Sequence, residues 1–158
     1  MQRPEDPSSA AFAPVTIEVS EHPSQAELDL IAREVRSFNR AVGGHEPPRP
    51  VGCFLRDDAG RIVGGVRGDL WGRSVHVAAL WVAESHRGQG HGAALMEALE
   101  ACAAAQGHVL AYVETLSFQA RPFYERLGYR VFAELEGIAE GCTFYFLRKD
   151  LVPASPAA

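Results

Sequence analysis

Hydrophobic positions along this chain change their spacing several times, and these changes predict its helices and strands. From Ser24 to Val42 apolar residues recur every three or four positions, which predicts an amphipathic helix with Ser24 as its N-cap and the following glycine pair as its stop. Its apolar positions are Leu28, Ile31, Ala32, Val35 and Phe38. Two further helices are expected from Gly90 to Gln106 and from Ser117 to Leu127.

Shorter apolar runs predict strands. They lie at Val15–Val19, Val51–Arg56, Arg61–Val66, Ser74–Val82, Val109–Glu114, Tyr129–Leu135 and Thr143–Arg148. The turn-forming run Asp57–Gly60 predicts a hairpin, whereas Pro47, Pro48 and Pro50 are expected to forbid regular structure around them. The resulting order, β-α-β-β-β-α-β-α-β-β, predicts an α/β (α+β) fold with a mixed sheet covered by helices.

Length and composition narrow the picture. A chain of 158 residues fits one domain, which we expect to span residues 15–151, with flexible tails at 1–14 and 152–158. The hydrophobic content of 47% and charged content of 22% are typical of globular proteins. A formal net charge of −5 argues against a nucleic-acid partner and suits cationic substrates such as amines.

Cysteine usage and hydropathy bear on cofactors and location. Cys53, Cys102 and Cys142 are scattered without metal-ligand spacing, so we expect no metal site and a reducing compartment. There is no signal-like start and no apolar run of membrane-spanning length. We therefore expect a cytoplasmic protein with no membrane partner.

The most informative segment runs from Leu80 to Leu95. An apolar strand leads into a loop with Gly88, Gly90 and Gly92 at alternate positions, and a helix begins inside that loop. Glycines let the backbone turn sharply and let a ligand approach the peptide N–H groups, and the helix start adds unpaired N–H groups with a partial positive charge. The segment therefore predicts a binding site for a phosphate or pyrophosphate.

Two other interpretations of these glycines stay open on the residues alone. The run Gly88–Ala93 also fits the dinucleotide pattern G-x-G-x-x-G/A, with Glu114 downstream as a ribose ligand. A dinucleotide domain opens with alternating strands and helices, however, and several strands precede this loop without intervening helices. The glycines could also form a plain turn that caps an ordinary helix.

Two motifs follow each other along the chain, Arg87-Gly88-Gln89-Gly90-His91-Gly92 and the run Ala120–Tyr129. In this order they resemble the GNAT superfamily of acetyl-CoA-dependent N-acetyltransferases. The first is similar to the family's Gln/Arg-x-x-Gly-x-Gly/Ala pyrophosphate loop, and the second is similar to its Ala-x-x-Φ-Tyr-x-x-x-Gly-Phe/Tyr block. The resemblance covers Val15 to Leu151. The runs Glu114–Ala120 and Phe146–Leu151 look like a small bacterial branch whose members mostly lack assigned substrates.

The resemblance implies a GNAT-like fold and the place of the cosubstrate. It implies a mostly antiparallel central sheet of about seven strands with helices on both faces, and acetyl-CoA in a V between the strands ending at Val82 and Glu114. Main-chain groups of Leu80 and Val82 would pair with the pantetheine arm, and loop N–H groups would bind the pyrophosphate. Ser117 stands where many members place an Asn that bonds the pantetheine. The implied cosubstrate-binding residues are Leu80, Trp81, Val82, Arg87, Gly88, Gln89, Gly90, His91, Gly92, Ala93, Ser117, Ala120 and Phe123.

Three residues are candidates for acid–base catalysis. Tyr124 matches the family's proton-donating tyrosine, although it could instead be an aromatic core residue. His76, eleven residues before Arg87, is the candidate base, because some relatives carry Glu or His at that offset; it could equally be a hydrogen-bonded strand histidine. Glu114 could act as a base through water or bind the substrate amine.

Taken together, these patterns predict an N-acetyltransferase. We expect direct transfer of the acetyl group of acetyl-CoA, in a ternary complex, to a primary amine of a small molecule or peptide, with a homodimer as a candidate assembly. The alternatives are a non-catalytic acyl-CoA-binding sensor of the same fold and a dinucleotide-dependent oxidoreductase.

Overall fold

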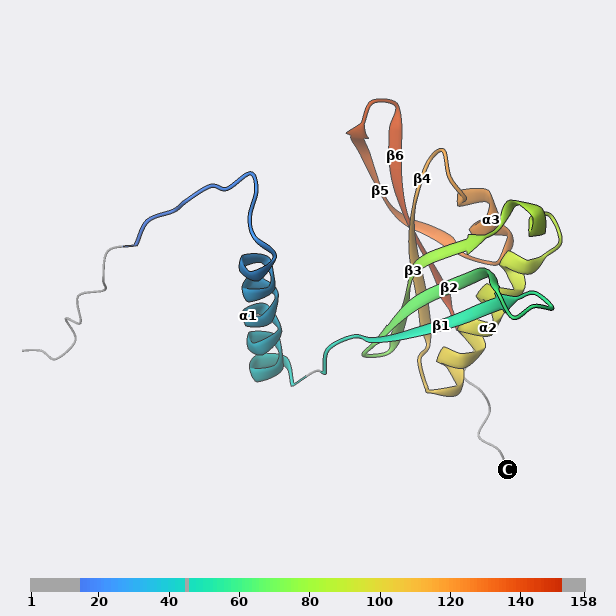
Figure 1. The fold of residues 1–158 in the computed structure, drawn as a ribbon, viewed down its shortest axis with the longest axis horizontal. Coiled ribbons are helices and arrows are strands. Elements are labelled where there is room, and N and C mark those ends of the chain that lie inside the picture. Colours follow the sequence, from blue (N-terminus) through green and yellow to red (C-terminus); the bar gives the residue numbers. More distant parts are fainter. Residues whose placement is uncertain (1–14, 45, 152–158) are drawn as a thin grey trace, which may run out of the picture.

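A single six-stranded sheet organises the protein (Figure 1). The computed structural model describes residues 15–44 and 46–151. The strands, in the spatial order β1-β2-β3-β4-β6-β5, are antiparallel neighbours except for the parallel pair β3–β4. The strands are β1 Arg49–Arg56, β2 Ile62–Trp71, β3 Ser74–Val82, β4 Leu110–Leu116, β5 Arg130–Ala139 and β6 Cys142–Asp150. The helices are α1 Gln25–Gly43, the short 3-10 helix η1 Glu84–His86, α2 His91–Ala105 and α3 Arg121–Arg126.

The hydrophobic core lies between one face of the sheet and α2. Alternate side chains of β2, β3 and β4 point to this face, which gives each strand its alternating burial. A Cβ on Gly68 would stand 3.2 Å from Leu99 Cδ1, so the missing side chain lets α2 approach the sheet closely. The α3 segment adds Tyr124 and Tyr129 to the same core. The buried apolar residues of α2 are Leu95, Met96, Leu99 and Ala103.

A buried polar network ties α2 to the C-terminal part of the sheet. The Tyr129 hydroxyl donates to Glu100 Oε1 at 2.9 Å, and Lys149 Nζ donates to Glu100 Oε2 at 2.5 Å. Burial, followed by the charge of Glu100, raises the pKa of the Tyr129 phenol. Since Glu100 is 8% exposed and each of its carboxylate oxygens accepts a hydrogen bond, the network fixes how α2 sits against β6.

Strands β3 and β4 separate part-way along their length. Their parallel pairing covers only Ser74–Val77 and Leu110–Val113. Beyond it, β3 continues to Val82 and β4 to Leu116 without pairing to each other. Ala78 has no partner in the register with β2, which marks a bulge where the separation begins. The sheet therefore opens into a V, with free ladder positions along its arms.

The first predicted strand is wrong. Residues Val15–Val19 are exposed and belong to no strand, so the sheet has six strands instead of about seven. Alternating β-branched residues favour an extended backbone, but a strand also needs a neighbouring edge to bond. None of the described strands pairs with this segment.

Other boundaries shift for local reasons. Pro50, expected to forbid regular structure, lies within β1. Because β1 is an edge strand, the missing N–H of proline is tolerated there.

The third helix begins at Arg121 instead of Ser117. Gln119 Oε1 accepts the Leu116 N–H at 2.9 Å, and Thr115 Oγ1 accepts the Ala120 N–H at 3.3 Å, so side chains close a turn there. The tails predicted at 1–14 and 152–158 lie outside the described residues.

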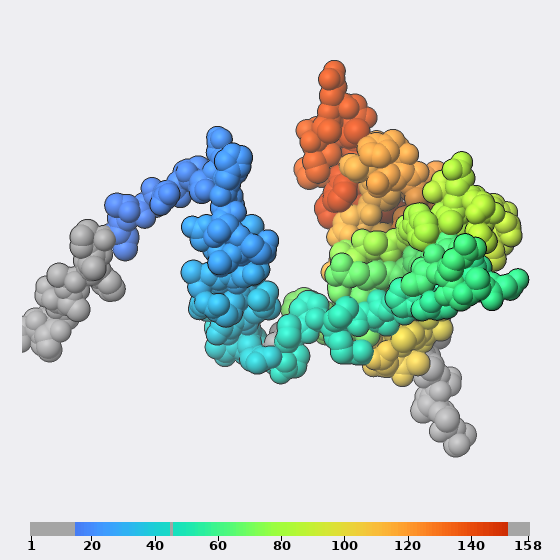
Figure 2. Space-filling model, viewed as in Figure 1, coloured from blue at the N-terminus to red at the C-terminus, as the bar shows by residue number. Residues whose placement is uncertain are grey.

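Helix α1 forms as its sequence predicts but stands away from the sheet (Figures 1 and 2). Ser24 caps it, since Ser24 Oγ accepts the Glu27 N–H at 3.3 Å while Glu27 Oε2 accepts the Ser24 N–H at 2.7 Å. None of its residues is buried. Among the described residues, no helix packs on the face of β1–β3 opposite α2, although helices on both faces were expected. No described helix is long and apolar enough to cross a membrane.

Candidate active site

A cavity of about 630 Å³ opens where β3 ends and α2 begins. Ligand cavities commonly occupy roughly 300–1,000 Å³, so this one can take a substantial ligand. Of the predicted cosubstrate-binding residues, only Gln89 and Ser117 do not line it. The lining residues are Leu80, Trp81, Val82, His86, Arg87, Gly88, Gly90, His91, Gly92, Ala93, Ala120, Phe123, Arg126 and Leu127.

The glycines give the cavity wall its shape. Gly88 and Gly90 have φ angles of 72° and 84°, in the left-handed region that side chains disfavour. Gly90 is the N-cap residue of α2, and no side chain of the described residues caps this helix. A Cβ on Gly92 would stand 3.4 Å from Phe123 Cζ, so glycine lets α3 lie against the first turn of α2. The first N–H groups of α2 are therefore available to an anion.

Two polar side chains hold the loop to the strand before it. Arg87 Nε donates to the Val82 carbonyl at 2.9 Å, and Gln89 Nε2 donates to the Ser85 carbonyl at 3.3 Å. Arg87 thus lines the cavity while it fixes the loop. Gln89 serves the loop without lining the cavity.

The arm of β3 presents main-chain groups to the open V. The Ala83 N–H donates to the Val63 carbonyl at 2.8 Å, while Val82 faces Gly64 in the register. In an antiparallel ladder this makes Val82 a non-hydrogen-bonded pair member, with its own N–H and C=O turned away from β2. Leu80, two residues earlier, has the same orientation. The Val82 carbonyl is already taken by Arg87, which leaves its N–H and both groups of Leu80 for a ligand.

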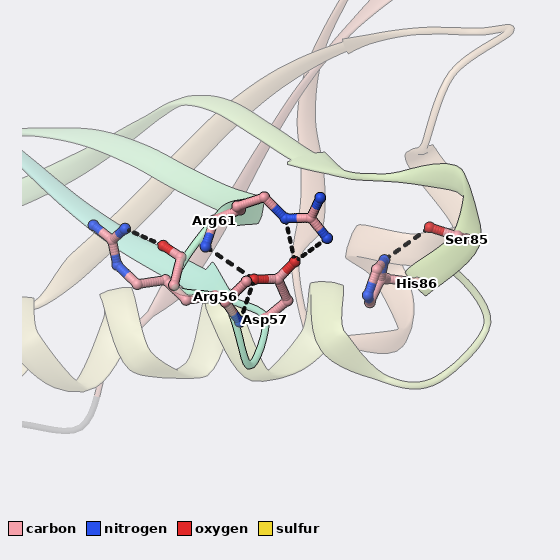
Figure 3. A network of polar contacts seen from close by, with 7 residues as sticks. Arg56, Asp57, Arg61, Ser85 and His86 are labelled. Carbon is pink, nitrogen blue, oxygen red and sulfur yellow. Dashed lines mark hydrogen bonds and ion pairs between the residues drawn. The ribbon is translucent and has the colours of Figure 1, made fainter.

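Two basic residues at the cavity were not among the predicted site residues. Arg126 follows Tyr124 by two positions on α3, and His86 ends η1. Figure 3 shows His86, with Ser85 Oγ 2.9 Å from its Nδ1, beside the β1–β2 turn. That turn is closed by Asp57, which accepts from Arg61; this bond is the main reason why the pKa of the Asp57 carboxyl is lowered. A basic residue in the second motif was the sequence signal that could have indicated Arg126.

His76 and Glu114 meet at the apex of the V. His76 Nε2 lies 2.6 Å from Glu114 Oε2, and both side chains are partly buried, at 28% and 27% exposure. The Tyr112 ring stacks on His76 with centroids 4.7 Å apart. Burial and the nearby Glu114 carboxylate raise the pKa of the Tyr112 phenol. The sequence offered these two residues as separate candidates, and the parallel register of β3 and β4 brings them together.

Tyr124 and Ser117 lie differently from the other predicted residues. Tyr124 is 6% exposed, with edge-to-face contacts to Phe123 and Tyr129 at 5.1 and 5.8 Å, and burial raises the pKa of its phenol. It does not line the cavity, although its neighbour Phe123 does. Ser117 Oγ accepts the Thr143 N–H at 3.3 Å and also lies outside the cavity lining. Within residues 15–44 and 46–151, no group of three His, Cys, Asp or Glu side chains is placed to hold a metal ion.

Comparison with known proteins places this architecture in a family. A model of the acetyltransferase (GNAT) domain matches residues 50–131. The blasticidin-S acetyltransferase of Streptomyces morookaense is 38% identical over 106 residues, which cover 66% of this chain and 78% of the relative. A putative acetyltransferase from Agrobacterium tumefaciens has a solved structure that matches with a TM-score of 0.80 and 26% identity, covering 86% of this chain and 99% of the other. An acetyltransferase from Bacillus cereus matches with a TM-score of 0.74 and 30% identity, covering 85% and 98%. With the glycine loop, the V and these matches in agreement, the chain belongs to the GNAT family of acetyltransferases.

Proposed function

We propose that this protein transfers the acetyl group of acetyl-CoA to a primary amine of a small molecule or peptide, by direct attack in a ternary complex. The observation that carries the proposal is the joining of two features. A cavity whose glycine loop and helix start suit a phosphorylated ligand lies at one arm of the V, and the His76–Glu114 pair lies at its apex. A single ligand that extends from the glycine loop to the apex would bind in the cavity and place its reacting group beside the His76–Glu114 pair.

The cavity residues suit the phosphate and pantetheine parts of acetyl-CoA. The free N–H groups at the start of α2 and the basic side chains of Arg126, His86 and His91 suit the pyrophosphate. The outward-facing main-chain groups of Leu80 and the Val82 N–H suit an extended amide chain, which would add to β3 as another strand does. Arg87 acts on the loop through its bond to Val82.

At the apex, the chemistry needs a base and an acid. The amine nitrogen must be neutral when it attacks the thioester carbonyl, and we assign its proton to the imidazole of His76, which the contact with Glu114 orients. As the C–S bond breaks, we assign the proton that the departing thiolate takes to the Tyr124 phenol. Tyr124 is buried outside the cavity lining, in contact with Phe123, which lines the cavity. The raised pKa of that phenol keeps it protonated at neutral pH. Much of the rate comes from holding the two reactants in place.

The acceptor that we propose is an amine, and a similar protein of known activity suggests which amine to test first. The similarity to a blasticidin-S acetyltransferase makes blasticidin S the first acceptor to test, beside polyamines, aminoglycosides and peptides with free amino ends. The net charge of −5 favours cationic acceptors such as these. Membership in an acetyltransferase family weighs against the dinucleotide interpretation of the same glycines.

A thermal-shift titration followed by a thiol-release assay tests the proposal. We expect acetyl-CoA, and not NADH or NADPH, to raise the unfolding temperature, because only a ligand that binds the folded state stabilises it. We then expect an amine from the panel to release free CoA thiol above the rate of acetyl-CoA alone. Stabilisation by acetyl-CoA without amine-dependent thiol release across the panel would favour the sensor alternative.

A further inference from the structure

The sheet face opposite α2 carries an uncovered apolar groove of about 380 Å³ across β1, β2 and β3. Its lining combines the small residues Gly52, Gly65 and Ala79 with the aromatic residues Phe54 and Trp81. Arg67, which pairs with Asp69, is the charged residue among those that line it. These two aromatic residues are 60% and 51% exposed. Contiguous exposed apolar surface commonly marks an interaction site or a ligand-binding groove.

Helix α1 carries a matching apolar stripe. Its large apolar side chains recur at helical spacing and share one side of the helix, and they are exposed in the structure, up to 72%. They are Leu28, Ile31, Val35, Phe38 and Val42. At 1.5 Å per residue the 19-residue helix is about 28 Å long, close to the roughly 26 Å of the eight-residue strand β1. The stripe and the groove are therefore complementary in chemistry and in length.

A hinge that includes Glu46, Pro47 and Pro48 joins α1 to β1, and its contacts hold α1 away from the sheet of its own chain. Arg40 Nη2 bonds Glu46 Oε2 at 2.7 Å, and Trp71 Nε1 donates to the Glu46 carbonyl at 3.1 Å, so Glu46 ties the end of α1 to the outer end of β2. Pro47 and Pro48 follow, and prolines favour an extended chain. Figure 2 shows the helix standing apart from the sheet. A cavity of about 730 Å³ lies between α1, this hinge and Trp71, and it contains none of the predicted site residues.

The residues that carry α1 take part in the match to a solved structure. The body from Arg49 to Leu151 makes up about two thirds of the 158 residues. The match to the Agrobacterium structure covers 86% of the chain with a TM-score of 0.80, so it extends into the residues before Arg49. The sequence of α1 is thus included in the match, and its apolar stripe is exposed in the structure.

We propose that a second copy of this chain covers the groove, and that the two copies exchange their α1 helices. Each helix would lay its apolar stripe in the groove of the other protomer, and two-fold symmetry would form both contacts at once. Every exposed large apolar residue of the stripe and the groove would then be buried without a change at the hinge. Both surfaces of this interface, the α1 stripe and the groove, are already present in each chain.

Light scattering after gel filtration, at several protein concentrations, tests the exchange. We expect the parent protein at twice the chain mass of 17.1 kDa. Val35→Asp on the stripe and Phe54→Glu in the groove should each give monomers, because each breaks both reciprocal contacts. Ser37→Asp, on another side of α1, is the matched control and should stay dimeric.

Mixing the Val35→Asp and Phe54→Glu variants gives the most specific test of the exchange. A mixed dimer contains one contact with both substitutions and one contact with neither, so dimers should reappear on mixing. A monomeric parent, a dimer that both substitutions leave intact, or a mixture that stays monomeric would overturn the proposal. A monomeric parent whose thermal stability falls with Val35→Asp would show instead that α1 closes on its own groove.

Discussion

Helices α1 and α2 have similar lengths, but only α2 is packed against the sheet. The 15 residues of α2 are apolar on most sides, and five of them are buried against the sheet. The 19 residues of α1 have a clear apolar side, a capping box and a glycine stop, and none is buried. The comparison teaches that a periodic pattern identifies the side of a helix that needs cover, while the position of the helix depends on the chain around it. The segments from Leu80 to Leu127 pack into the core of one molecule, whereas α1 is left exposed.

The largest effect should come from the loop at the start of α2. Gly90→Glu forces a side chain into a backbone with φ of 84° and adds a negative charge where the pyrophosphate would bind, so acetyl-CoA binding should be lost. Isothermal titration calorimetry measures it. Gly107→Glu is the control, because its φ of 85° gives the same strain away from the cavity. Unchanged affinity in a folded Gly90→Glu protein would refute the loop assignment.

Stability should separate the two helices directly. Leu99→Ala on α2 empties a fully buried position and should lower the free energy of unfolding by about 2–5 kcal/mol. Leu28→Ala on α1, 46% exposed, should change it by less than about 0.5 kcal/mol in dilute monomer. Urea unfolding followed by circular dichroism measures both values. If α1 is buried in a dimer, the Leu28→Ala effect should grow with protein concentration. Equal losses for the two variants in dilute protein would break the comparison.

Tyr124→Phe should lower turnover by about 10²-fold while acetyl-CoA affinity changes little. The substitution keeps the edge-to-face packing and removes only the hydroxyl. Tyr129→Phe is the control: it loses the bond to Glu100, which should reduce stability more than turnover. Since the protonated phenol is the active form and burial raises its pKa, any alkaline fall in activity due to Tyr124 should lie above about pH 10. Parental turnover in Tyr124→Phe would make this residue a packing residue.

The smallest of these effects should be the loss of rate when the apex pair is replaced. His76→Gln keeps much of the volume but cannot accept a proton, so turnover should fall. Glu114→Gln should lower turnover less, because the carboxylate acts by orienting His76. Parent and variants must be compared with one amine at one pH, since the amine titrates too. Identical rates would make the pair structural.

Most of the predicted cosubstrate-binding residues line one cavity because they are close together in the sequence. The glycines, the strand before them and the helix after them are contiguous, and all but Gln89 and Ser117 of the predicted cosubstrate-binding residues line the cavity. The His76–Glu114 contact could not be predicted, because it depends on the parallel register of β3 and β4. The strand predicted at Val15–Val19 was wrong because an alternating pattern does not show whether another strand lies beside it to bond. In the same way, the spacing of apolar residues in α1 predicts the helix but not the surface against which it packs.

The central claim is that acetyl transfer to an amine occurs at the apex of the V. The most direct test counts both products in one reaction: free CoA thiol and acetylated amine, the latter identified by mass spectrometry, for the parent and for His76→Gln. We predict equal amounts of the two products in the parent and a matched decrease of both in the variant. Thiol released without acetylated amine, or equal product from parent and variant, would contradict the account.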